Sequence, residues 1–127
     1  MASPVMTQGA YGNLANGVSI VASGVSAPVT VDATTKFEVQ LQVDVLTGGA
    51  AQAAATATVK VYRLFGAGPT SDNVPVTQVQ IALGAVTTHY IQSLALPTGK
   101  YSVTVANGDT ASGISFSLTS SSVDSIN

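Results

Sequence analysis

Residues 37–45 read Phe-Glu-Val-Gln-Leu-Gln-Val-Asp-Val, and this stretch decides the fold class. Apolar side chains occupy every second position, and polar or charged side chains occupy the positions between them. Successive side chains of a β-strand point to opposite faces, so the alternation predicts a strand with one buried and one solvated face. The buried face is expected to carry Phe37, Val39, Leu41, Val43 and Val45.

The same pattern recurs on both sides of this strand. Downstream, alternating segments cover residues 59–65, 76–83, 87–96, 101–105 and 114–118. Upstream, two short β-rich pieces at 18–22 and 29–31 are separated by Gly24 and Pro28, which is typical of a broken edge strand. Turn-forming residues recur about every eight to twelve positions and no amphipathic helix pattern occurs, so the sequence predicts an all-β, antiparallel sandwich of seven to nine short strands.

The chain of 127 residues is expected to form one domain with a flanking segment at each end. Residues 1–17 are polar and poorly patterned, and they are interpreted as an irregular N-terminal arm. Residues 18–118 are expected to form the sandwich, and residues 119–127 a polar tail.

Stretches rich in glycine, proline or alanine predict the loops. Residues 48–58 are mostly alanine but lack an apolar stripe, which favours a long loop over a short helix. Residues 66–74 are dense in glycine and proline and predict a second loop. Tight turns are expected at Pro97–Gly99 and at Asn107–Asp109, because asparagine and glycine accept a positive φ.

Charge is scarce: ten Asp, Glu, Lys and Arg residues make up 8% of the chain, against about 25% in ordinary globular proteins. A surface this weakly ionised favours a protein partly covered by other protein chains, including copies of itself, although a weakly charged monomer is the alternative. Four basic residues against six acidic ones argue against nucleic acid as a partner. The first residues lack the basic and apolar regions of a signal peptide and no stretch is long enough to span a bilayer, so a cytoplasmic product that starts at Met1 is expected, with no membrane partner.

No group of residues suggests catalysis or a cofactor. His89 is the only histidine, which argues against a metal site and favours a plain strand residue. The serines lack a Gly-x-Ser-x-Gly motif, and Glu38 and Asp44 would lie about 20 Å apart on one strand, too far for a glycosidase pair. We therefore expect a protein that is not an enzyme and binds no cofactor. Calcium bound by Asp72–Asn73 or by Asn107–Asp109 remains an open alternative.

Residues 94–105, Leu-Ala-Leu-Pro-Thr-Gly-Lys-Tyr-Ser-Val-Thr-Val, resemble the E–F corner of immunoglobulin-like domains. The resemblance implies an immunoglobulin-like fold in which the Tyr101 hydroxyl bonds to upstream backbone. Leu96 would pack beneath the corner, Pro97 would turn the chain and Gly99 would supply the unusual backbone angle. The cysteine pair and core tryptophan of antibody domains are absent.

In general character the chain also resembles accessory virion proteins of tailed bacteriophages, of the head decoration or cement type. Like them it is short, free of cysteine and rich in Val, Ala, Thr, Ser and Gly. The resemblance implies a non-enzymatic protein that is made in the host cytoplasm, joins the virion and binds the major capsid protein or other virion proteins. The arm is expected to lie along neighbouring chains through Pro4, Val5, Met6 and Tyr11.

A second functional class is an immunoglobulin-like adhesion module of a phage tail or a cell surface. Such a module would sit on an extracellular surface and bind a host glycan or protein. Residues 48–58 and 66–74 would then form the contact loops. Tyr11, Tyr62 or Tyr90 would offer an aromatic surface to a sugar.

Overall fold

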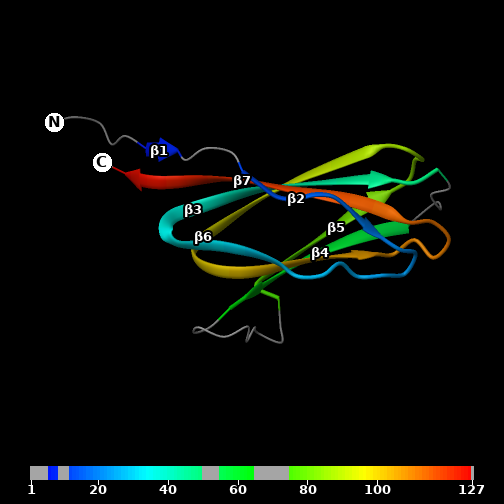
Figure 1. Cartoon of the computed structure of the whole chain (residues 1–127), viewed down its shortest axis with the longest axis horizontal. Helices are drawn as coiled ribbons and strands as arrows, with labels where there is room; N and C mark the ends of the chain where they lie inside the picture. The colour runs from blue at the N-terminus through cyan, green and yellow to red at the C-terminus, as the bar shows by residue number, and fades with distance from the viewer. Residues whose placement is uncertain (1–5, 9–11, 50–54, 65–74, 127) are drawn as a thin grey trace.

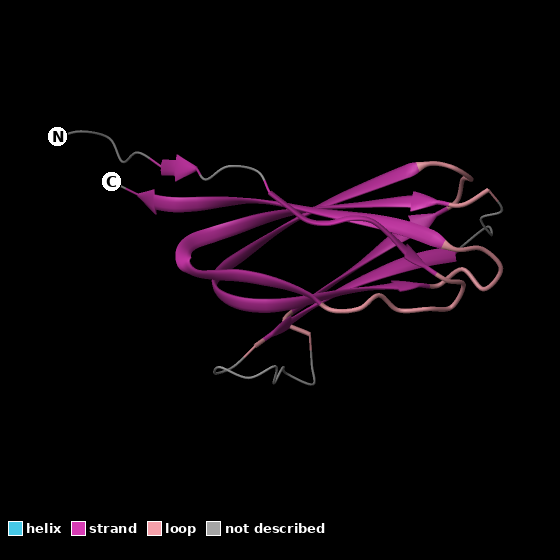
Figure 2. Ribbon diagram, in the orientation of Figure 1, coloured by secondary structure: helices cyan, strands magenta, loops and turns pink. Residues whose placement is uncertain are grey.

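The computed structural model describes residues 6–8, 12–49, 55–64 and 75–126. Strands account for the regular structure throughout these ranges, which contain no helix and hence none that could cross a bilayer. The strands are β1 (Met6–Gln8), β2 (Gly12–Ile20), β3 (Val29–Thr47), β4 (Ala55–Arg63), β5 (Thr77–Leu83), β6 (His89–Asn107) and β7 (Ile114–Ile126). The chain is therefore all-β, as predicted (Figure 2).

All neighbouring strands pair in an antiparallel manner within one sheet. Six strands form a continuous hydrogen-bonded path in the order β1-β7-β3-β6-β4-β5, and β2 lies beside β7 off this path. Antiparallel pairing suits strands joined by short connections, such as those at residues 84–88 and 108–113.

The pair β3 and β6 bends along its length and folds the sheet over itself. Residues 38–46 of β3 pair with 89–97 of β6, residues 29–33 pair with 99–103, and the register shifts between Ala33 and Glu38. In Figure 1 both strands curve back at the same end of the molecule. The sheet thus has two layers. We call the layer that contains β2, β7, β3 from Glu38 and β6 up to Pro97 the first layer, and the layer that contains the start of β3, β6 from Gly99, β4 and β5 the second layer.

The core lies between the two layers. Alternate residues along much of β3, β4 and β7, and along the second half of β6 and the end of β5, point into it, and they are almost all Val, Leu, Ile, Ala or Phe. Phe116, Leu41, Leu83 and Leu118 are the largest apolar side chains that are fully buried. Each such side chain contributes about 1.5–3 kcal/mol relative to exposure. The predicted inward residues of 39–45, 101–105 and 114–118 are confirmed in this core.

Phe37 corrects the first prediction, because its side chain is 54% exposed. Residues 34–37 have no register partner on β6, since the shift between Ala33 and Glu38 leaves them outside the ladder. The alternation that buries Val39 therefore does not extend back across the bend. A local pattern of apolar residues cannot reveal such a shift.

The prediction of seven to nine short strands also needs correction, because β3 and β6 bend and continue at positions where the sequence predicted that one strand would end and another begin. β3 and β6 have 19 residues each, and β7 has 13. Pro97–Gly99, predicted as a turn between strands, lies within β6. The segments 29–31 and 37–45, predicted as separate strands, both belong to β3.

The two ends of the chain are more regular than predicted. Residues 6–8 and 12–17 belong to β1 and β2 rather than to an irregular arm, and residues 119–126 extend β7 rather than forming a tail. Their strand pairing depends on backbone hydrogen bonds, which Ser, Thr, Asn and Gly make as readily as apolar residues. The composition of these segments therefore hid their structure.

Two predicted connections also differ from the structure. β4 begins at Ala55, inside the loop predicted for 48–58, of which residues 50–54 lie outside the described part. The connection from β6 to β7 spans residues 108–113 rather than a tight turn at Asn107–Asp109. Gly108 is needed there because a Cβ would overlap the Thr56 carbonyl oxygen, not because its φ is positive.

Candidate interaction surfaces

The corner residues lie together at the bend of β6. The hydroxyl of Tyr101, a side chain only 2% exposed, donates a hydrogen bond to the Pro97 carbonyl oxygen at 2.9 Å. Leu96 is buried beside it in the core. Gly99 has a φ of 154°, and a Cβ there would lie 3.1 Å from the Tyr101 hydroxyl oxygen. This is the hydroxyl-to-upstream-backbone contact that the immunoglobulin-like resemblance implies, and it fixes the path of β6 between the two layers.

The residues proposed for contacts of the arm are not brought together within the described structure. Pro4, Val5 and Tyr11 lie outside the described residues. Met6 begins β1, where its backbone pairs with Ile126. The interaction role of these four residues stays a prediction.

The loops proposed for adhesion are also largely outside the described residues, which omit 50–54 and 65–74. Tyr90, one candidate aromatic residue, has a structural contact instead. Its hydroxyl oxygen accepts hydrogen bonds from the N–H groups of Gly84 and Ala85, at 3.1 and 2.9 Å. Tyr90 thereby fixes the connection between β5 and β6.

His89 has a partner that the sequence did not reveal. Its Nδ1 lies 2.9 Å from Oδ1 of Asp44, on the neighbouring strand β3. Their side chains are 60% and 30% exposed, so the pair is solvated, and surface pairs of this kind contribute about 0–1 kcal/mol. Their separation of 45 positions in sequence explains why only the register could reveal the contact.

The Asn107–Asp109 segment uses its polar side chains within the protein. The Asp109 carboxylate accepts hydrogen bonds from the N–H groups of Ala111 and Ser112, at 2.9 and 3.1 Å. The Asn107 amide donates to the carbonyl oxygens of Val21 and Ser112. Asp72–Asn73 lies outside the described residues, and within the described ranges no group of three or more His, Cys, Asp or Glu residues gathers in a metal-binding arrangement.

Asp32, near the start of β3, carries a carboxylate that is held by hydrogen bonds from Thr34. The Thr34 hydroxyl and N–H both donate to Asp32 Oδ1, at 2.7 and 3.1 Å. The hydroxyl bond, then the N–H bond, and to a smaller extent the nearby charge of Lys100 hold the pKa of Asp32 below its ordinary value. Asp32 is therefore ionised at neutral pH.

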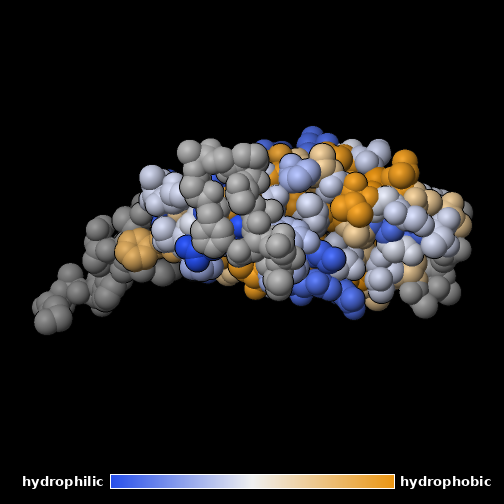
Figure 3. All heavy atoms as spheres, turned by 90° about the horizontal axis from the view of Figure 1, so that it is seen from below, coloured by the Kyte–Doolittle hydropathy of each residue, from blue (hydrophilic) through white to orange (hydrophobic). Residues whose placement is uncertain are grey.

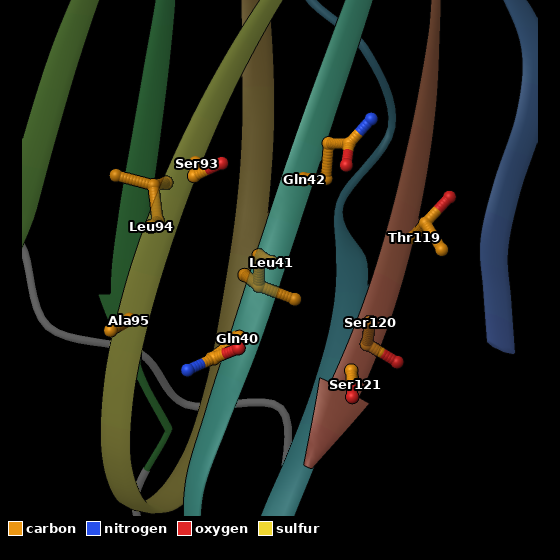
Figure 4. A pocket seen from close by; sticks show the side chains of 9 residues that line it. All are labelled: Gln40, Leu41, Gln42, Ser93, Leu94, Ala95, Thr119, Ser120 and Ser121. Atoms are coloured by element: carbon orange, nitrogen blue, oxygen red, sulfur yellow. The ribbon is translucent and has the colours of Figure 1, made fainter. Parts of the chain in front are cut away.

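A shallow groove of about 400 Å³ crosses the outer face of the first layer (Figure 4). Gln40 and Gln42 rise from β3 in its middle, and small residues of β6 and β7 flank them. The full lining is Gln40, Leu41, Gln42, Ser93, Leu94, Ala95, Thr119, Ser120 and Ser121. It contains amides and hydroxyls but no ionisable side chain, so it suits a neutral polar partner.

Large exposed apolar residues occur over several elements rather than in one place. They lie on β2, in the β2–β3 connection, at the bend of β3, on β6 and near β5, and the most exposed are Val21, Val25, Ile91, Phe37, Val86 and Val76. Figure 3 shows one face, on which hydrophobic residues form several separate patches among hydrophilic ones. A dispersed pattern of this kind fits several modest contacts better than one apolar binding site.

The free edges of the two layers differ in character. On one side of the fold, β5 and residues 89–96 of β6 each have one strand neighbour among the described residues, with no register shift and no Lys, Arg, Asp, Glu or Pro. We call these two strands the bare edges. On the other side, β2 pairs with β7 through two register shifts, and the start of β3 carries Asp32 and follows Pro28. Charges and bulges are among the usual protections of an edge strand, so the second side is the better protected one. Prolines do not distinguish the sides, because Pro75 lies just before β5 as Pro28 lies just before β3.

No protein-family model matches the chain, and no curated protein sequence matches it. Solved structures give likeness of fold. A chain from the disulfide-linked pili of Bacillus endospore appendages has a TM-score of 0.52 and 13% identity, over 98% of this chain and 93% of that one.

Two other matches are parts of larger chains. A chain of infectious bursal disease virus, Gt strain, gives a TM-score of 0.53 with 12% identity, and the match covers 95% of this chain and 32% of the viral one. Tripeptidyl peptidase 2 gives a TM-score of 0.58 with 10% identity, over 88% of this chain and 10% of the peptidase. At such identities these likenesses concern the fold alone, and they place the chain among β-rich domains that occur in viral particles, pili and enzymes.

Proposed function

We propose that this chain is a non-enzymatic structural protein that works by contact with other protein chains. The observation that carries the proposal is the absence of Lys, Arg, Asp and Glu from two candidate contact surfaces, namely the groove and the bare edges. A solitary soluble domain is better served by charges at its edges and faces, because they repel other molecules. Neutral amides, hydroxyls and backbone groups instead favour close contact with a neutral polar surface.

The proposed setting is a virion, where the chain binds and stabilises the outside of a phage capsid. The fold likeness to a chain of infectious bursal disease virus and to a chain of Bacillus pili supports an extracellular particle as the setting. The partners would be the major capsid protein or other virion proteins. Since this chain has no cysteine, a disulfide link of the kind named for those pili is not available to it.

We also propose that the two-layered sheet is an immunoglobulin-like sandwich. Three features support this assignment: two layers that enclose one core, the bend of β6 between them, and the bond from Tyr101 to Pro97 at that bend. The fold would then present its sheet faces and edges to neighbours without any catalytic group.

Electron microscopy of phage capsids mixed with the purified chain tests the capsid role. We expect added density on the outer capsid surface with the native chain and reduced occupancy with Gln42→Lys, which places a charge in the neutral groove. Ser19→Lys, at an exposed position on β2 outside both the groove and the bare edges, is the control and should occupy the capsid normally. Bare capsids, with all of the native chain left in solution, would refute the capsid role.

The proposed part of the N-terminal segment has its own test. Removing residues 1–8 leaves β2 intact and takes away Pro4, Val5 and Met6. If these residues lie along neighbouring chains, the shortened protein binds capsids more weakly than the full chain. Equal binding by the two proteins would remove the segment from the proposal.

The groove favours one second candidate, a module that binds a neutral glycan. Its glutamine amides and its serine and threonine hydroxyls are the groups that bond to sugar hydroxyls, and about 400 Å³ is enough for a small ligand. A glycan-array signal that disappears with Gln40→Ala or Gln42→Ala would support this function. If the array gives no signal and density appears on the capsid, the glycan-binding function is rejected and the structural role is retained.

A further inference from the structure

We propose that β5 is the contact between two copies of this chain, paired antiparallel across a two-fold axis. This inference rests on the proposed structural function and names one partner and one surface for it. Two observations support it. β5 is a regular edge strand without a charged residue at the end of the second layer, whereas the edge strand β2 on the other side of the molecule is interrupted by register shifts.

The backbone of β5 is already shaped for another strand. All seven of its residues pair with β4 in one unbroken register, from Thr77 opposite Val61 to Leu83 opposite Ala55. Its inner side chains Ile81 and Leu83 are buried in the core, which holds the strand in place at the end of the second layer. The main-chain groups on its open side have no partner among the described residues, and an edge in this state is a template for another strand.

A second copy of the same chain fits this edge because the strand is self-complementary. An antiparallel pair about a two-fold axis brings each N–H and C=O group to its counterpart on the other strand. If the axis passes Gln80, that residue faces Gln80 of the second copy, and Val79 faces Ile81 of the second copy. Thr77 then faces Leu83 of the second copy, so the whole strand takes part.

The side chains at this axis favour identical partners. A glutamine amide both donates and accepts, so two facing Gln80 amides bond to each other, whereas two facing carboxylates or ammonium groups repel. The nearest charged residue in the register is Lys60, which belongs to β4 and stands opposite Gln78. No charge therefore opposes the approach of an identical strand.

The other bare edge is less suited to this contact. Along residues 89–96 of β6, the Gln92 side-chain amide donates to the Ser93 carbonyl oxygen at 3.3 Å, so one main-chain acceptor is already engaged. His89 at its start forms the pair with Asp44 and brings an ionisable group to that edge. β5 has neither feature, so it is the better candidate for the contact between two copies.

Cysteine cross-linking tests the pairing, since the full-length chain contains no cysteine of its own. In Gln80→Cys the two new thiols face each other across the axis, within the range in which directly opposed strand residues form a disulfide. We expect mild oxidation to give a covalent dimer in high yield. Gln42→Cys, at a position that is also exposed but lies in the middle of the first layer, is the control and should stay monomeric.

A charge variant gives an independent measurement on the native contact. Gln80→Lys opposes two ammonium groups at the axis and is expected to raise the dimer dissociation constant at least about fivefold in analytical ultracentrifugation. Gln42→Lys is the matched control and should leave dimerisation unchanged. Thermal unfolding of both variants checks that the exposed lysines leave the fold intact.

Each alternative outcome overturns the inference in a distinct way. Cross-linking through Ser93→Cys but not Gln80→Cys would move self-association to β6. A Gln80→Cys variant that cross-links only to a capsid protein would give β5 a different partner. A native chain that stays monomeric at every concentration, yet still adds density to capsids, would end the proposed pairing while the structural function stands.

Discussion

The two sides of this molecule are built from the same kinds of residue but treat their edges differently. β2 is interrupted by two register shifts, and the start of β3 combines Asp32 with a preceding proline. β5 and the first half of β6 run without a shift and without a charged residue. The difference shows that low charge alone does not leave an edge open; the regularity of the pairing matters as well.

The bend of β6 creates this contrast. Residues 101–107 have β4 on one side, and β3 pairs on the other side as far as Val103. Residues 89–96 lie before the bend, beyond the reach of β4, and pair with β3 alone. The corner at Pro97–Tyr101 is therefore the point at which a fully covered strand becomes an edge, and changes there should break the comparison most severely.

The largest effect is expected from Gly99→Ala. A φ of 154° is strained for any residue with a Cβ, and the new methyl would press on the Tyr101 ring and hydroxyl. We expect a loss of about 2 kcal/mol in the free energy of unfolding, measured by urea denaturation. Gly84→Ala is the control, because a Cβ there meets no atom within 4 Å and its φ is not positive. Equal stability of Gly99→Ala and the native chain would show that the corner does not hold the bend.

Tyr101→Phe sharpens the same point with a smaller change. It removes the bond to the Pro97 carbonyl oxygen and leaves that oxygen facing an apolar ring instead of a hydroxyl. The expected cost is about 1 kcal/mol of unfolding free energy. Tyr62→Phe, at a half-buried tyrosine whose hydroxyl has no hydrogen bond to the described residues, should change stability by much less. A Tyr101→Phe protein as stable as the native one would limit the corner to packing.

Asp32→Thr removes the charge from the protected side and tests whether that charge matters. If it guards the start of β3, the variant should associate about threefold more strongly than the native chain, as expected for the loss of one like-charge contact between edges. Light scattering over a concentration series measures the change. Glu38→Thr, which removes a charge in the first layer away from that edge and from the bare edges, is the control. Indistinguishable association of Asp32→Thr and native protein would show that this charge does not protect the edge.

The smallest effect concerns the pKa of Asp32. In Thr34→Val the hydroxyl bond is lost, so this pKa should rise toward the ordinary 3.8 in an NMR titration. Because the folded-state pKa is lowered, Asp32 stabilises the fold above its unfolded pKa, and that contribution disappears as the pH falls through the folded pKa. The native chain should therefore lose slightly more stability on acidification than Thr34→Val does. An unchanged titration would assign the shift to the Thr34 N–H and Lys100.

The sequence predicted strands and burial correctly where neighbouring residues differ clearly in polarity. Apolar and polar residues alternate strictly from Val39 to Val45, so burial there followed from the pattern. Residues 12–17 and 119–126 offer little such contrast, and their strands rest on backbone pairing that composition does not record. Phe37 was misplaced because its exposure depends on a register shift produced by the partner strand.

The candidate surfaces divide in the same way. The corner was predictable because Pro97, Gly99 and Tyr101 lie close together in sequence and act locally. Neither the His89–Asp44 pair nor the groove across three strands could be predicted from the sequence, because both depend on the register of β3 with its neighbours. The bare edges could not be predicted without the complete strand order, because a strand is an edge only when no other strand pairs with one of its sides.

Amide hydrogen exchange at low and high concentrations of the native chain tests the pairing of β5 most directly. We expect the outward N–H groups of β5 to exchange quickly in dilute solution and much more slowly in concentrated solution, while exchange along β2 stays the same. Exchange in β5 that is equally fast at every concentration would contradict the account.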